Sequence, residues 1–176
     1  MSDNSSSESK IDNPHFASVA SWAAAEEMLT FRPLQPGEPA GFRLQSLSIF
    51  VRDHKQRELP IGERSLEAHY GGFVLTQARK GESEARRWAL RVSYGAAAFP
   101  VSLAGHEGRA YRLGPEVPPD DIDGRSPAVV VWHDGDMFFL IASGELAVEE
   151  LIDIAGSIYF PPVKGREGSG GRGGTT

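Results

Sequence analysis

The sequence contains no cysteine among its 176 residues, and this absence removes several kinds of chemistry. Without thiols the chain cannot form disulfides, use a thiolate nucleophile, or hold zinc or an iron–sulfur cluster through cysteine. It also lacks any run of the roughly 18–20 apolar residues that a membrane helix needs. Basic residues are scarce too: 18 Lys and Arg face 24 Asp and Glu, for a net charge of −6. That balance argues against a dedicated nucleic-acid binder, whose surface would be basic.

What remains is the composition of an ordinary globular protein. Apolar residues make up 40% and charged residues 24% of a chain whose length fits one domain. The start of the chain is polar and Ser-rich, without the apolar core of a signal peptide, so we expect a cytoplasmic protein with no membrane insertion. We expect a disordered N-terminal tail over 1–15, a single domain over 16–160, and a disordered Gly- and Arg-containing tail over 161–176.

The folded part predicts a short helix followed by a series of strands. Apolar residues at helical spacing predict a helix over 18–29, and Pro33 and Pro36 stop it. Gly71-Gly72 suggests a bulge within one strand or a close backbone approach, and residues 105–108 read as the turn of a hairpin. The strand-like segments before the last hairpin are 42–53, 69–78, 88–94, 101–104 and 109–113.

The strongest local pattern is a hairpin over 128–143. Asp134-Gly135 is a favoured two-residue turn, and it predicts that Trp132 pairs with Met137. One face of the hairpin then carries Val129, Val131, Phe138 and Leu140, and the other carries Val130, Trp132, Met137, Phe139 and Ile141. Because both faces are apolar, we expect the hairpin to be covered on both sides or to line a cavity.

A final helix is predicted over 147–159, where apolar residues form a continuous stripe. The expected fold is therefore α+β: a curved antiparallel sheet of about six strands, covered by an N-terminal and a C-terminal helix. Between them, residues 114–127 read as a loop with Asp120, Asp121 and Asp123, which lack the spacing of an EF-hand calcium loop.

The segment Val130-Val131-Trp132-His133-Asp134-Gly135, with Phe138-Phe139 and the helix beginning Glu149-Glu150-Leu151, resembles a family of unknown function. That family occurs in the extracytoplasmic parts of anti-sigma-factor-like proteins and sporulation lipoproteins. The stretch from Phe31 through Pro33 and Pro36 to Leu44 is similar as well. The resemblance implies a LolA/RseB-like half-barrel, a curved antiparallel sheet with helices on its concave face. It implies no active-site residues.

The sequence offers no catalytic constellation, and we expect a protein that is not an enzyme and holds neither cofactor nor metal. Its five histidines have no metal-ligand spacing, and no nucleophile elbow or phosphate loop is present. We expect a non-catalytic binding, sensory or interaction domain, with a protein partner or a second copy. The alternatives are a carrier of an apolar ligand or lipid held between sheet and helices, and an unrecognised hydrolase. The candidate binding residues are Trp132, His133, Met137, Phe139 and Ile141.

Overall fold

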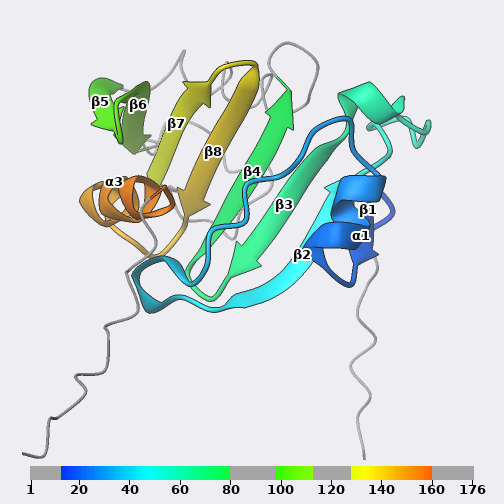
Figure 1. Ribbon diagram of the computed structural model, residues 1–176, viewed down its shortest axis with the longest axis horizontal. Coiled ribbons are helices and arrows are strands. Elements are labelled where there is room, and N and C mark those ends of the chain that lie inside the picture. Colours follow the sequence, from blue (N-terminus) through cyan, green and yellow to red (C-terminus); the bar gives the residue numbers. More distant parts are fainter. Residues whose placement is uncertain (1–12, 80–97, 113–127, 160–176) are drawn as a thin grey trace, which may run out of the picture.

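The computed structural model describes residues 13–79, 98–112 and 128–159 (Figure 1). Within these ranges the chain forms one antiparallel sheet with a small number of helices. The strands are β1 (Phe16–Val19), β2 (Leu44–Phe50), β3 (Ser65–Tyr70), β4 (Phe73–Arg79), β5 (Phe99–Leu103), β6 (His106–Arg112), β7 (Ala128–Asp134) and β8 (Met137–Ser143). The helices are α1 (Trp22–Glu27) and α3 (Val148–Ser157), and two 3-10 turns are η1 (Pro39–Gly41) and η2 (Ile61–Glu63).

The strand order across the sheet is β1-β2-β3-β4-β8-β7-β6-β5, and every pairing is antiparallel. The predicted α+β class with an antiparallel sheet is confirmed. The described residues supply eight strands rather than about six. In the sheet, β8, β7 and β6 lie between β4 and β5, whereas β7 and β8 are neighbours joined by a tight turn.

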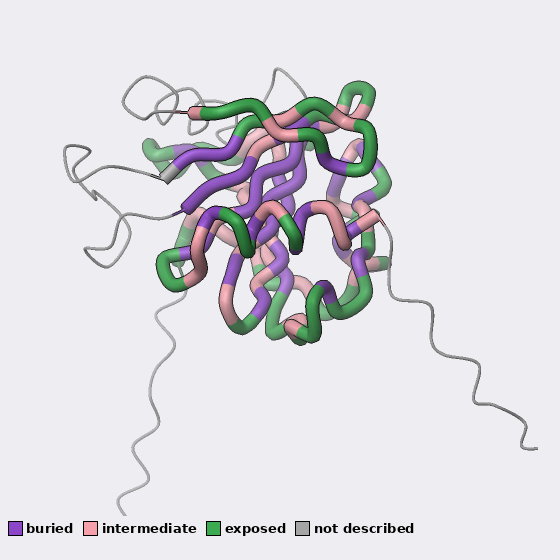
Figure 2. Tube along the Cα trace, turned by 90° about the vertical axis from the view of Figure 1, so that its left-hand side faces the viewer, coloured by how far each residue is buried: buried purple, intermediate pink, exposed green. Residues whose placement is uncertain are grey.

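The two faces of the sheet carry separate apolar clusters. On the inner face, side chains of the sheet pack against α1, α3 and the chain between α1 and β2 in one continuous core. Figure 1 shows α3 over the half of the sheet that contains β7, and α1 over β1 and β2. In Figure 2 buried residues run along the strands, and exposed ones gather in the turns. Each large apolar side chain that is fully buried stabilises the fold by about 1.5–3 kcal/mol.

The first predicted helix is shorter than expected. The hydroxyl of Ser21 accepts a hydrogen bond from the Ala24 N–H at 3.2 Å, so Ser21 caps the helix and α1 begins at Trp22. The residues before it form β1, in which Phe16 pairs with Phe50. His15 was expected in the tail, yet its Nδ1 lies 3.2 Å from the carbonyl of Arg52.

The segment 69–78, expected to be one strand, contains the end of β3 and most of β4. Tyr70 pairs with Phe73, so Gly71-Gly72 is the turn between β3 and β4 and not a bulge. A close approach does occur at Gly72, where a Cβ would lie 2.7 Å from the Phe42 ring. The predicted turn over 105–108 is also shorter, because Leu103 already pairs with His106.

The hairpin of β7 and β8 has the predicted faces but a different register. Trp132 pairs with Phe139, and Asp134 pairs with Met137, so the turn consists of Gly135 and Asp136. Gly135 has φ of 60°, as a turn with glycine at its first central position requires. The shift moves each partner by two residues. Because side chains alternate with period two, the assignment of residues to the two faces is unchanged.

A bulge in β2 changes the side on which Leu44 lies. Leu44 pairs with Tyr70 and Ser46 pairs with His69, so one extra residue is inserted between these two pairs. Leu44 therefore packs with Leu47 against the inner core, although simple alternation puts the two on opposite faces.

The final helix is confirmed, as α3 lies within the predicted range. Apart from residues 13–15, the expected tails fall outside the described residues, as do the strand over 88–94 and the Asp-rich loop over 114–127. In the part of the chain that the structure describes, no helix is long and apolar enough to cross a membrane.

Candidate functional site

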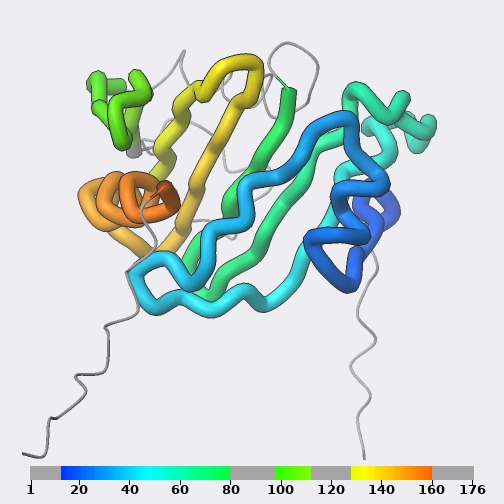
Figure 3. Tube along the Cα trace, in the orientation of Figure 1, coloured from blue at the N-terminus to red at the C-terminus, as the bar shows by residue number. Residues whose placement is uncertain are grey.

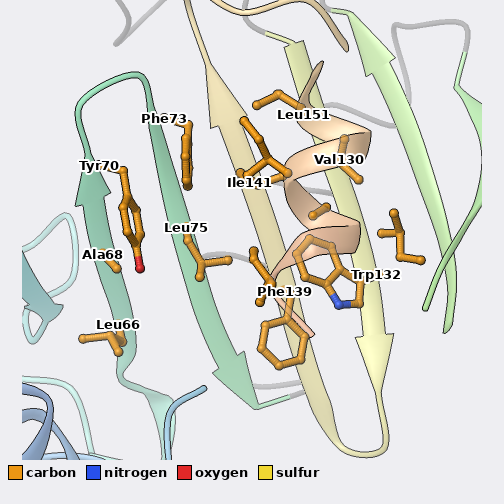
Figure 4. Close-up of a cluster of buried hydrophobic side chains, with 14 of the residues drawn as sticks. Leu66, Ala68, Tyr70, Phe73, Leu75, Val130, Trp132, Phe139, Ile141 and Leu151 are labelled. Carbon is orange, nitrogen blue, oxygen red and sulfur yellow. The ribbon is translucent and has the colours of Figure 1, made fainter. Parts of the chain in front are cut away.

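Three of the five predicted binding residues form the centre of the inner core. Trp132, Phe139 and Ile141 point to the same side of the sheet, under α3 (Figure 4), and each is at most 4% exposed. The rings of Trp132 and Phe139 stack with centroids 5.2 Å apart and planes 11° from parallel. These side chains belong to the core cluster and are packed against other side chains of the protein.

The other two predicted residues lie at the end of the hairpin and on different faces. Met137 is half-buried and packs against the inner core. His133 is exposed on the outer face, where its ring centroid is 5.3 Å from that of Phe138. The sheet therefore brings four of the five residues together and holds His133 apart from them, as expected from alternation along β7.

Sequence reasoning missed three residues that surround Trp132. The indole N–H of Trp132 donates a 2.8 Å hydrogen bond to the hydroxyl of Tyr159, the last described residue after α3. His106 stacks on the Tyr159 ring with centroids 4.9 Å apart. Asp134 completes the group, with its Oδ1 3.8 Å from Nδ1 of His106. We refer to Trp132, Tyr159, His106 and Asp134 as the Tyr159 corner.

Gly108 makes the close packing of this corner possible. It pairs with Trp132 across β6 and β7. A Cβ at this position would lie 2.6 Å from the carbonyl oxygen of Val131 and 3.1 Å from Cβ of Trp132. Glycine thus allows the backbone of β6 to approach β7 directly beside the indole.

The surroundings of Tyr159 determine the protonation state of its hydroxyl. Burial raises the pKa of Tyr159, the Trp132 N–H lowers it, and the carboxylate of Asp134 raises it again. The net effect is a raised pKa, so the hydroxyl stays protonated at neutral pH and is a weak nucleophile. The 3.8 Å separation of His106 and Asp134 is longer than a hydrogen bond. The corner joins the end of α3 to the sheet and presents polar groups at its rim.

A second arrangement lies on the inner face of the sheet, beside α3. Residues 30–39, which we call the strap, leave α1 and cross the sheet over β3 and β4 (Figure 3). Gln77 in β4 is fully buried and holds the strap through its side-chain amide. Its Oε1 accepts the Leu34 N–H at 2.7 Å, and its Nε2 donates to the Leu34 carbonyl at 2.8 Å. The side chain thus replaces the peptide group of a neighbouring strand.

The strap has the burial pattern of a polyproline segment. Pro33, Pro36 and Pro39 are buried, whereas Arg32, Gln35 and Glu38 are exposed. Residues 32–37 are neither helix nor strand. Buried positions that recur every three residues match the three-residue turn of a polyproline II helix. The three prolines therefore lie on the buried side of the strap.

Aromatic residues lie on the sheet beside the proline end of the strap. The hydroxyl of Tyr70 donates to the carbonyl of Pro36 at 3.2 Å, and burial raises the pKa of Tyr70 to about 12. The Tyr70 ring stacks on Phe73 with centroids 4.7 Å apart, and Phe42 meets Phe73 edge-on at 5.4 Å. Proline-rich segments bind such aromatic surfaces because the rings pack well on pyrrolidine and tyrosine hydroxyls donate to backbone carbonyls.

Two features of the sequence carried a signal for this site. The prolines at 33, 36 and 39 have a spacing of three, although alone they indicate only the end of a helix. Gln77 follows Phe73 and Leu75 on the same face of the strand Phe73–Arg79, and a buried amide must find hydrogen-bond partners. Which segment supplies them depends on tertiary structure.

The outer side of the β7–β8 hairpin is buried as well, together with parts of β4 and β6. Tyr111 and Val129 are fully buried there, and Phe138 and Leu140 are at most 5% exposed. Both faces of the hairpin are therefore covered, as its apolar pattern predicts.

No protein-family model matches the sequence, and neither a curated protein nor a solved structure matches it.

Proposed function

We propose that this chain is a non-catalytic interaction domain that binds an extended polypeptide segment on the inner face of its sheet. The observation that carries the proposal is the pair of hydrogen bonds between the Gln77 side chain and the backbone of Leu34. An amide that contacts only backbone atoms recognises an extended segment by its main chain, which is how sheets bind peptides at their edges.

The proposed mode of binding differs from the carrier alternative. A carrier needs open apolar space between the sheet and the helices. Trp132, Phe139 and Ile141 are buried against protein in that region, and the strap lies over the neighbouring strands. What the inner face holds is therefore polypeptide, and this supports the interaction domain over the lipid carrier. A co-purified lipid in native mass spectrometry would support the carrier instead.

The half-barrel relationship is part of the same proposal. We infer that the domain is related to the LolA/RseB-like superfamily and to the extracytoplasmic domains of anti-sigma-factor-like proteins. The supporting observation is a single open antiparallel sheet with helices on one face. Interaction, rather than hydrolysis, is also supported by the Tyr159 corner, in which the tyrosine stays protonated and the His106–Asp134 pair is too far apart for a hydrogen bond.

The test is whether the strap can leave the sheet while the sheet stays folded. Gln77→Leu removes both hydrogen bonds to Leu34 at nearly constant volume and leaves no buried charge. Hydrogen exchange measured by mass spectrometry should show faster exchange over residues 30–36, with unchanged protection in β3 and β4. The matched control is Gln35→Leu, at an exposed glutamine of the strap. It should change neither the exchange rate over residues 30–36 nor the protection of β3 and β4. Equal loss of protection in the strap and in β3 and β4 would show that the strap is an integral part of the core and would contradict the proposal.

A further inference from the structure

The way in which the strap is held defines what else could occupy its place. Gln77 contacts the N–H and the carbonyl of the same residue, Leu34. A proline at that position would lack the N–H, so the site requires a residue other than proline there. Pro33 precedes that residue and Pro36 follows two positions later, and both are buried. The pattern that fits is proline, a residue with a free N–H, any residue, then proline.

A third proline extends the pattern by one further turn. Pro39 is buried and begins η1, which lies close to α3. The Tyr70 hydroxyl donates to the Pro36 carbonyl, and so fixes the segment between Gln77 and η1. Because proline restricts φ before binding, an extended segment of this kind loses little conformational entropy when it docks.

From this geometry we propose that the inner face around Gln77 and Tyr70 is a docking site for a proline-rich extended segment of a partner protein. The strap is then the chain's own occupant of that site and holds it closed. The partner segment carries prolines three residues apart and a residue with a free N–H after the first of them. The assignment rests on the proposed function, since it names the ligand of the same surface.

The connection of the strap to the rest of the chain explains why the site is closed. The strap is covalently linked to α1 at one end and to β2 at the other. A short tether gives a bound segment an effective concentration in the millimolar range. A partner segment of equal intrinsic affinity would therefore compete poorly with the intact strap, and binding in trans should appear once the strap is weakened.

The experiment uses the full chain with four substitutions that weaken the docking of its own strap on the sheet: Phe31→Ser, Pro33→Gly, Leu34→Ser and Pro36→Gly. We call this variant the vacated chain. The probe is a fluorescent synthetic peptide with the sequence of residues 30–40, titrated by fluorescence anisotropy. The vacated chain should bind this peptide at least about tenfold more tightly than the wild-type chain does. Adding Gln77→Leu to the vacated chain should weaken binding about tenfold, which corresponds to the loss of two net hydrogen bonds.

A second peptide separates specific docking from general adhesion of proline. It differs from the probe only by proline in place of Leu34. The change increases the proline content but removes the N–H that donates a hydrogen bond to Oε1 of Gln77. It should bind at least about tenfold more weakly than the probe. Equal binding of both peptides, or no binding of either to a vacated chain with a cooperative thermal transition, would overturn the proposal.

Two further measurements keep the outcome decisive. If the vacated chain does not fold, the milder pair Pro33→Gly and Pro36→Gly, which keeps Phe31 and Leu34, is titrated in the same way with the same expected ratios. Light scattering of the vacated chain mixed with wild type would reveal a heterodimer if the occupant were the strap of a second copy, and that result would overturn the assignment to a partner segment. The peptide titration and the hydrogen-exchange test can also give different answers. If no peptide binds but hydrogen exchange shows that the strap opens in Gln77→Leu, the proline-rich ligand is rejected and the proposed function is retained.

Discussion

The Trp132 indole in β7 donates a 2.8 Å hydrogen bond to the hydroxyl of Tyr159, which follows α3. The contact joins two segments that are 27 residues apart and fixes the end of the helix to the sheet. Trp132 is 1% exposed, so water cannot replace Tyr159 as the acceptor without a rearrangement. The hydrogen bond is therefore a structural requirement of the buried indole.

Tyr159→Phe should lower the free energy of unfolding by about 1–3 kcal/mol, because it leaves the buried Trp132 N–H without an acceptor. Urea denaturation followed by tryptophan fluorescence measures the change. The matched control is Tyr111→Phe. The Tyr111 hydroxyl is buried on the outer face without a hydrogen-bond partner among the described residues, so its removal should be neutral or stabilising. A larger loss for Tyr111→Phe than for Tyr159→Phe would contradict this account of the corner.

Two glycine-to-alanine changes should have opposite effects on stability. Gly108→Ala places a Cβ 2.6 Å from the Val131 carbonyl, so β6 must move away from β7 and the protein should lose about 1–3 kcal/mol. Gly156→Ala adds a methyl group within α3 where no atom lies within 4 Å, and should stabilise the protein by about 0.5–1 kcal/mol through helix propensity. Thermal denaturation of both variants distinguishes the two, and a stable Gly108→Ala variant would mean that β6 and β7 are farther apart.

Stability should fall in alkaline solution. Burial raises the pKa of Tyr70 to about 12 from 10.0, and it also raises the pKa values of Tyr111 and Tyr159. The folded state holds these protons more tightly than the unfolded state does, so the stabilisation is fully present below pH 10 and is lost as pH rises from about 10 to 12. Urea midpoints between pH 8 and 11.5 measure the slope. Tyr70→Phe should make the decline of stability with pH shallower. An unchanged slope would mean that the Tyr70 hydroxyl is exposed to solvent in the folded state.

Gly135→Val should destabilise the β7–β8 hairpin by about 1–3 kcal/mol, because Gly135 has φ of 60° and a β-branched residue is strained there. No atom lies within 4 Å of a Cβ at this site, so the loss reports backbone strain and not a clash. Gly144→Val, at another position with open space and no positive φ, is the control. Equal unfolding free energies for the two variants would show that the turn does not need the left-handed conformation.

Local patterns were sufficient for the elements whose signals lie close together in the chain. The hairpin of β7 and β8 and the helix α3 follow from alternation and from a helical stripe, and both were predicted. The register of the hairpin was wrong by two residues, because glycine can serve either as the second or as the first residue of a two-residue turn. The faces were nevertheless right, since both registers preserve the parity of the pairing.

Features that depend on distant partners could not be predicted in the same way. Gly71-Gly72 is compatible with a bulge and with a turn, and the choice is made by the pairing of β3 with β4. The partner of Trp132 was missed because Tyr159 belongs to the apolar stripe of the helix pattern. The role of Gln77 was missed because its partner, Leu34, is 43 residues away in a segment without regular secondary structure. The prolines signalled a helix end, while their buried face appears only when the strap crosses the sheet.

The most direct test of the central claim is the hydrogen-exchange rate of the Leu34 amide in the wild-type chain, measured by NMR. If Gln77 holds the strap, the Leu34 N–H is bonded inside the protein, whereas Arg32 and Gln35 on either side are exposed. We expect the Leu34 amide to exchange at least about a hundredfold more slowly than those of Arg32 and Gln35 after correction for intrinsic rates, since opening must cost more than a single net hydrogen bond. Equal protection factors at the three positions would mean that the strap is not docked on Gln77, and would contradict the claim that the inner face of the sheet binds an extended segment.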